Sequence, residues 1–148
     1  MVSGVREYLQ SLIRSERLGR QVVFQTVLPQ SRALWSEPIT RYPSAIEQAL
    51  RSAGIKSLYR HQSQAIEKIR NGQNVIVATP TASGKSLIYN LPVLERFQTD
   101  INSRSLYIFP LKALAQDQLK AFEKMAAHFG ENQPTAAIYD GDTTAYRR

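Results

Sequence analysis

The run of residues 79–86, with the sequence TPTASGKS, constrains this 148-residue chain more than any other feature. It follows a short apolar, β-branched run at residues 74–78, typical of a buried strand, and precedes a stretch with leucines at helical spacing. When a strand is followed by a Gly-Lys-Ser turn and then by the first turn of a helix, backbone N–H groups and the helix dipole point to one place. A phosphate binds well there. The run therefore predicts a phosphate-binding loop, although Thr79 stands where the usual pattern has its first Gly.

The pattern also predicts roles for the residues of the loop. In such a loop the Lys reaches the outer phosphates and the hydroxyl that follows it holds Mg²⁺, so Lys85 is the expected catalytic residue and Ser86 the expected metal ligand for Mg·ATP. The expected nucleotide contacts comprise the whole loop: Thr79, Pro80, Thr81, Ala82, Ser83, Gly84, Lys85 and Ser86. The alternative is a Ser/Gly turn with a solvated lysine.

Charge and composition narrow the class of partner. The net charge of +7 and the isoelectric point near 9.9 favour a polyanionic partner such as nucleic acid. The absence of cysteine excludes disulfides and thiolate metal sites. The start lacks the apolar core of a signal peptide, and no stretch approaches the ~18 apolar residues of a membrane span. We therefore expect a cytoplasmic protein without membrane contact.

The hydrophobic pattern divides the chain in two. Residues 1–57 predict a mixed N-terminal extension with an amphipathic helix near its start and a strand-like run at 21–28. From residue 58 onward helices and strands alternate, with helices expected at 61–71, 86–97 and 112–129 and strands at 74–78, 105–109 and 135–139. Strands separated by such helices require parallel pairing with right-handed crossovers. The pattern therefore predicts an α/β fold with a three-layer, mostly parallel sheet.

Four segments within residues 56–148 together resemble the first motor domain of superfamily-2 helicases of the DEAD/DEAH type. They are LYRHQSQAI at 58–66, TPTASGKS at 79–86, FPLKALAQDQ at 109–118 and YDGDT at 139–143. Their wording is most similar to the DNA-repair helicases of the mitomycin repair factor A type, which track along single-stranded DNA. The resemblance implies a RecA-like P-loop motor fold, incomplete in these 148 residues.

The first of these segments resembles the glutamine motif that precedes the phosphate loop. Gln62 lies 23 positions before Lys85, the spacing expected of that family. A glutamine amide donates and accepts hydrogen bonds at once, which suits the N6/N7 edge of adenine, and Tyr59 or Arg60 would stack on the base. The alternative is that Gln62 is an exposed helix residue without a ligand.

The last two segments imply a surface for single-stranded nucleic acid, DNA more than RNA. The third resembles motif Ia, in which a strand end runs into a helix start that can hold a phosphate. The expected contacts are Pro110, Leu111, Lys112, Gly141, Asp142 and Thr143. A capped helix with a solvated lysine and an ordinary Asp-Gly turn are the alternatives.

Phosphoryl transfer in such motors needs the carboxylates of a D-E-x-H motif and an arginine from a second motor domain. No Asp is followed by Glu anywhere in the sequence. We therefore expect residues 58–148 to be a helicase ATP-binding domain truncated before that motif, which binds ATP without turnover, whereas the full-length protein is an ATP-dependent DNA helicase. The alternatives are another P-loop enzyme, such as a small-molecule kinase or a GTPase, and a non-catalytic nucleic-acid-binding module with a vestigial loop. A GTPase should carry Asn-Lys-x-Asp, which does not occur.

Overall fold

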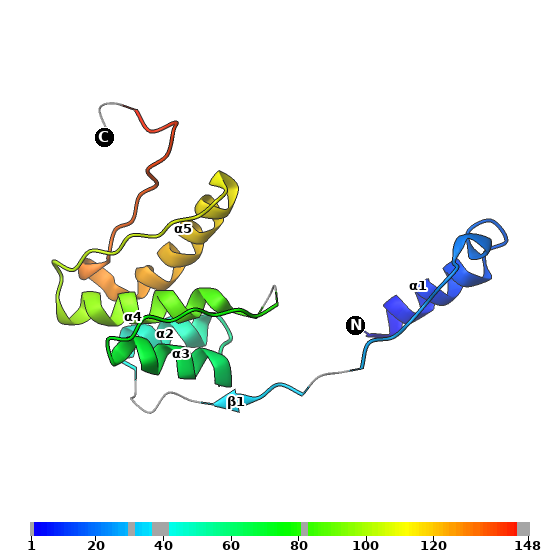
Figure 1. Ribbon diagram of the computed structural model, residues 1–148, viewed down its shortest axis with the longest axis horizontal. Helices are drawn as coiled ribbons and strands as arrows, with labels where there is room; N and C mark the ends of the chain where they lie inside the picture. Colours follow the sequence, from blue (N-terminus) through cyan, green and yellow to red (C-terminus); the bar gives the residue numbers. More distant parts are fainter. Residues whose placement is uncertain (1, 30–31, 37–41, 81–82, 145–148) are drawn as a thin grey trace. The chain divides into compact units, whose positions relative to one another are not determined.

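The computed structural model of the chain describes residues 2–29, 32–36, 42–80 and 83–144. The chain forms two compact units, Met1–Arg32 and Ala33–Arg148 (Figure 1). The division falls inside the expected extension of residues 1–57, because residues 33–57 pack with the second unit.

The first unit contains helix α1, Val2–Arg14, and the short 3-10 helix η1, Gly19–Gln21. Apolar residues recur along α1 at helical spacing, as the sequence predicts, and Val5, Leu9 and Ile13 remain exposed. The run at 21–28 forms no strand, so that prediction was wrong. The reason is that Val23 and Phe24 are almost fully exposed, with no layer over them to bury a strand.

In the second unit the described residues are mainly helical and include one small sheet. Its elements are β1 (Trp35–Ser36), α2 (Ser44–Ser52), β2 (Leu58–Tyr59), α3 (Arg60–Arg70), α4 (Lys85–Thr99), α5 (Lys112–Ala126) and the 3-10 helix η2 (Ala127–Asn132). The two strands pair antiparallel, with Trp35 opposite Tyr59 and Ser36 opposite Leu58. This pairing brings β1, which belongs to the expected extension, against the start of α3.

The core of the second unit lies between the helices. Ile46 of α2, Ile66 of α3, and Leu91 and Leu94 of α4 are fully buried, and Phe122 of α5 closes the same cluster. Figure 1 shows α2, α3 and α4 side by side with α5 beyond them, in agreement with the contacts of α4 to α2, α3 and α5. Within the described residues, no helix has the length and apolar character that crossing a bilayer requires.

A charged cluster fixes α3 against α4. The Arg70 guanidinium donates to both carboxylate oxygens of Glu95, at 3.0 and 2.5 Å, and to Glu67 at 2.5 Å. Its carbon also lies 4.8 Å from the centre of the Tyr42 ring. Two-pronged arginine–carboxylate pairs define orientation as well as distance. Arg70 therefore sets the position of the helix that carries Gln62 relative to the helix that begins at Lys85.

The expected strands at 74–78, 105–109 and 135–139 carry no strand pairing within the described residues, so the parallel sheet stays a prediction. The first two do have the alternating exposure of a strand: Tyr107 is half-buried against Phe122, whereas Ile76, Leu106 and Ile108 are more than four-fifths exposed. Tyr107 thus packs on the helices, whereas the outward-facing apolar side chains lack a covering layer. An apolar pattern can specify which side chains turn inward, but a strand also needs a neighbouring backbone about 4.8 Å away.

Candidate functional site

The predicted phosphate loop ends where α4 begins. Gly84 is the N-cap of α4 in the left-handed conformation, with φ 72° and ψ 30°, and Lys85 is the first residue of the helix. The hydroxyls of Thr79 and Ser83 lie 2.7 Å apart across the loop. Thr81 and Ala82, also expected to contact a nucleotide, lie outside the described residues. The arrangement has the helix start and the lysine that a phosphate site requires.

Lys85 folds back over its own loop. Its ammonium donates to the carbonyl oxygens of Thr79 at 2.9 Å and Pro80 at 2.7 Å, and it lies 3.3 Å from the Ser83 hydroxyl. An ammonium has three hydrogens, and oxygen atoms of the loop satisfy them here. A phosphate bound here would replace these oxygens as the hydrogen-bond acceptor of Lys85, whose ammonium is already held at the loop.

Gln62 is buried against this loop. The side chain is 2% exposed, its Oε1 accepts the Tyr59 N–H at 2.8 Å, and its Nε2 donates to the Gly84 carbonyl at 2.8 Å. The alternative of an exposed helix residue is therefore wrong. The bond also requires glycine at 84, since a Cβ there would lie 2.4 Å from Gln62 Nε2. Each end of the amide retains one further hydrogen or lone pair, and recognition of adenine through these stays a prediction.

An aromatic stack, which the sequence did not indicate, leads to the loop. Trp35 stacks on Tyr59 with 4.5 Å between ring centres, and Tyr59 stacks with His61 at 5.7 Å. His61 Nε2 lies 3.1 Å from the Ser83 carbonyl oxygen, and since a carbonyl only accepts, that nitrogen carries the hydrogen. The sequence gives no spacing that would link Trp35 to the loop, because only the pairing of β1 with β2 brings it to Tyr59.

The two residues expected to stack on a base differ in their surroundings. Tyr59 is half-buried and already engaged by protein rings, whereas the Arg60 side chain is exposed at the start of α3. The Arg60 N–H donates to the Leu34 carbonyl at 2.8 Å, which fixes the turn from β2 into α3. Arg60 is therefore the freer of the two side chains.

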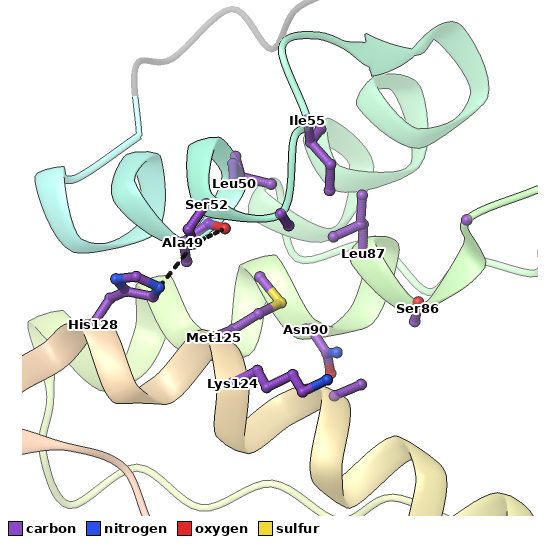
Figure 2. Close-up of a pocket in the computed structure, with 13 residues that line it drawn as sticks. Ala49, Leu50, Ser52, Ile55, Ser86, Leu87, Asn90, Lys124, Met125 and His128 are labelled. Atoms are coloured by element: carbon purple, nitrogen blue, oxygen red, sulfur yellow. Dashed lines mark hydrogen bonds between the residues drawn. The ribbon is translucent and has the colours of Figure 1, made fainter.

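A cavity of about 580 Å³ lies between α2, α4 and α5 and reaches Gly84 and Ser86 (Figure 2). Its walls are mostly apolar, and Ser52 and His128 are hydrogen-bonded at 2.9 Å on one side. Asn90 of α4 is 2% exposed there, and its Oδ1 has no hydrogen-bond partner. Ser86 is the only expected metal ligand, and no group of three or more His, Cys, Asp or Glu gathers within the described ranges.

The expected nucleic-acid contacts lie together at the start of α5. Leu111 is the N-cap of this helix, and the Lys112 ammonium donates to the Asp142 carboxylate at 2.5 Å. The hydrogen bond that Lys112 donates to the Asp142 carboxylate raises the pKa of Lys112 above its usual value. Asp142 and Thr143 are held in a turn by bonds to Asp140. The structure thus brings together two segments that are 30 residues apart in the chain.

Comparisons with known proteins agree on one family. The family model described as DEAD/DEAH box helicase matches residues 59–148. The uncharacterized ATP-dependent helicase YprA of Bacillus subtilis is 44% identical over 99 residues, which cover 67% of this chain and 13% of that protein. The ATP-dependent helicase HRQ1 of Saccharomyces cerevisiae is 32% identical over 149 residues, which cover 100% of this chain and 14% of that protein.

A solved structure is similar as well. The crystal structure of the DUF1998 helicase MrfA bound to DNA and AMPPNP superposes with a TM-score of 0.73 at 39% identity, over 78% of this chain and 16% of that chain. The chain therefore spans about one seventh of the length of the relatives it matches.

Proposed function

Because this chain belongs to the DEAD/DEAH box helicase family, we propose that it forms the nucleotide-binding part of an ATP-dependent DNA helicase. The observation that carries the proposal is the junction of the loop with α3, where Gln62 donates to the Gly84 carbonyl and Lys85 lies among the oxygen atoms of the loop. In such motors the base and the phosphates are held by these two segments, and here they are already in contact.

The residues of the loop fit ATP. A phosphate at the start of α4 would accept from the free N–H groups of the first helical turn and from Lys85 in place of the Thr79 and Pro80 carbonyls. The Ser86 hydroxyl would contribute one ligand to Mg²⁺, with the phosphates as the main ligands, because few protein carboxylates are at hand. When bound, ATP would supply the phosphoryl group, and Mg²⁺ would neutralise the negative charge of its phosphates.

Base recognition is assigned to the first turn of α3, which contains Arg60 and Gln62. Gln62 would read the N6/N7 edge of adenine with the hydrogen and lone pair that its bonds to Gly84 and Tyr59 leave over. Arg60, which is exposed, would stack on the base more readily than Tyr59.

The motor fold that the family implies is RecA-like, and the likeness to the MrfA structures supports it. We propose that residues 74–78, 105–109 and 135–139 are strands of its parallel sheet. Their support is the alternating exposure of the first two segments, and in the second of these Tyr107 packs against Phe122 of α5. In such a fold further strands would pair with the edges of the sheet, and helices would cover its open face.

Nucleic acid would bind at the start of α5. Lys112 and the N–H groups after Pro110 would contact phosphates, and the turn at Gly141 to Thr143 would lie beside them. MrfA is bound to DNA in two of its crystal structures, which supports DNA as the ligand. The proposal takes this DNA to be single-stranded and the parent protein to be a DNA-repair helicase. ATP turnover is not expected of the 148 residues, because they contain no Asp-Glu pair.

The test is nucleotide binding by a lysine variant and a matched control. Fluorescent ADP is titrated with the wild-type chain, with Lys85→Ala and with Lys120→Ala, which removes an equal charge at an exposed position of α5. Lys85→Ala should weaken binding by ~1.5–3 kcal/mol, roughly 10- to 150-fold, because charge-assisted bonds to phosphate are lost. Lys120→Ala should bind like the wild type. Equal affinities for all three proteins would refute the phosphate loop.

Selectivity for the base is tested in the same assay. Unlabelled ADP should compete better than GDP against the wild-type chain, and Gln62→Ala should remove the difference, since O6 of guanine would face the glutamine carbonyl. Equal competition against the wild type would refute the role of Gln62 in base recognition and leave the phosphate loop untouched.

A further inference from the structure

The Lys112 ammonium at the start of α5 already has an anionic partner. It bonds to the Asp142 carboxylate, although both side chains are well exposed, at 54% and 80%. Lys112 is also the first residue of its helix, so free N–H groups of the first turn lie next to the pair. A carboxylate thus occupies the position that the proposed function gives to a nucleic-acid phosphate.

The turn that carries Asp142 holds this carboxylate in place. The Asp142 N–H donates to Asp140 Oδ1 at 2.9 Å, and the Asp140 N–H donates to the Thr143 hydroxyl oxygen at 2.9 Å. Bonds of this kind between an Asp side chain and a backbone N–H two residues on define a tight turn. The negative charge of Asp140 acts on Lys112 as well. Of the two carboxylates of this turn, that of Asp142 makes the direct contact with the cation.

We propose that Asp142 is an intramolecular competitor of nucleic acid for Lys112. This inference rests on the proposed function, since it assumes that Lys112 contacts phosphate. A carboxylate repels a phosphate, so Asp142 belongs to the surface as a group to be displaced and is not itself a ligand. Binding of single-stranded DNA breaks the Lys112–Asp142 pair and frees the turn at 140–143 from α5.

The expected effect is modest because the pair is exposed. Pairs between exposed charges contribute little, so removing Asp142 should tighten binding by roughly 1.5- to 5-fold at low salt. The gain should shrink as salt rises from ~50 to ~200 mM, because salt screens the pair that Asp142 forms. The gain should also require Lys112.

The experiment measures anisotropy of fluorescently labelled oligo(dT) with the 148-residue chain and four variants. Asp142→Asn removes the charge with little change of shape, and Asp117→Asn is the matched control, an equal change at an exposed position of α5. Lys112→Gln and the double variant Lys112→Gln/Asp142→Asn complete a cycle. Asp142→Asn should bind more tightly than the wild type, Asp117→Asn should gain less, and Asp142→Asn should bring no gain in the Lys112→Gln background.

The outcomes distinguish the competitor role of Asp142 from the nucleic-acid surface at Lys112. If Lys112→Gln weakens DNA binding but Asp142→Asn gains no more than Asp117→Asn, the competitor role is overturned and the nucleic-acid surface stands. A gain from Asp142→Asn that persists without Lys112 overturns the competitor role too, since the effect is then one of general charge. If Lys112→Gln binds DNA like the wild type, the proposed surface fails and the competitor role fails with it.

Discussion

Gly84→Ala should destabilise the chain at the junction of the loop with α3, and its cost can be worked from two separate terms. Gly84 has φ 72°, a conformation that costs a residue with a Cβ ~1–2 kcal/mol. The new Cβ would also lie 2.4 Å from Gln62 Nε2, so the buried amide must leave the Gly84 carbonyl, at ~1–3 kcal/mol for the unsatisfied group. Together the terms predict a loss of about 2–5 kcal/mol in the free energy of unfolding.

A second glycine separates these two terms. Gly72, just beyond the end of α3, has φ 73° and nothing within 4 Å of a Cβ, so Gly72→Ala should incur the backbone cost alone. Urea unfolding of both variants, followed by circular dichroism, gives the two free energies. In a Gln62→Ala background the cost of Gly84→Ala should fall to that of Gly72→Ala. If Gly84→Ala costs no more than Gly72→Ala in the wild-type background, the close contact between Gln62 and the loop does not exist.

Three further predictions concern the same unit. Arg70→Met should lower the free energy of unfolding by ~1.5–3 kcal/mol, because Glu95 loses a two-pronged charged partner. The loss should be smaller in a Glu95→Gln background. Equal losses in urea unfolding of the two backgrounds would refute a stabilising role for the Arg70–Glu95 pair. His61→Ala should weaken ADP binding by roughly 2- to 10-fold, through loss of the bond to the Ser83 carbonyl, and unchanged affinity in the fluorescence titration would remove His61 from the site. With saturating Mg·ATP and oligo(dT), phosphate release should show no Lys85-dependent turnover at the ~1–100 s⁻¹ of kinase-type phosphoryl transfer. If turnover at that rate is observed, acidic residues outside any Asp-Glu pair must carry out the chemistry.

The sequence predicts the local elements of the site well. The loop before Lys85 and the helix that follows it depend on residues that are close in sequence. The spacing of 23 positions marks Gln62, although its bond to the Gly84 carbonyl was not predicted. Gly84 illustrates why: the turn into α4 needs a positive φ, and only glycine adopts it without strain. Such constraints act within a few residues, so a motif reveals them.

The parts that sequence reasoning missed depend on distant segments. The apolar run at 105–109 predicts a strand, but a strand also needs a neighbour, which no pattern within the segment specifies. Trp35 reaches Tyr59 only through the pairing of β1 with β2, and no motif marks this contact. The motif resemblance places Lys112 and Asp142 on one surface, but it does not indicate that they form an ion pair across 30 residues.

The central claim is that a nucleotide binds at the loop ending in Lys85 and touches the α3 segment that carries Gln62. At 16.7 kDa the chain suits a ¹H–¹⁵N spectrum titrated with Mg·ADP. The claim predicts that the largest shifts occur at the backbone amides of Gly84, Lys85 and Ser86 and at the side-chain amide of Gln62. Saturable shifts confined to other parts of the chain, with these four groups unchanged, would contradict it.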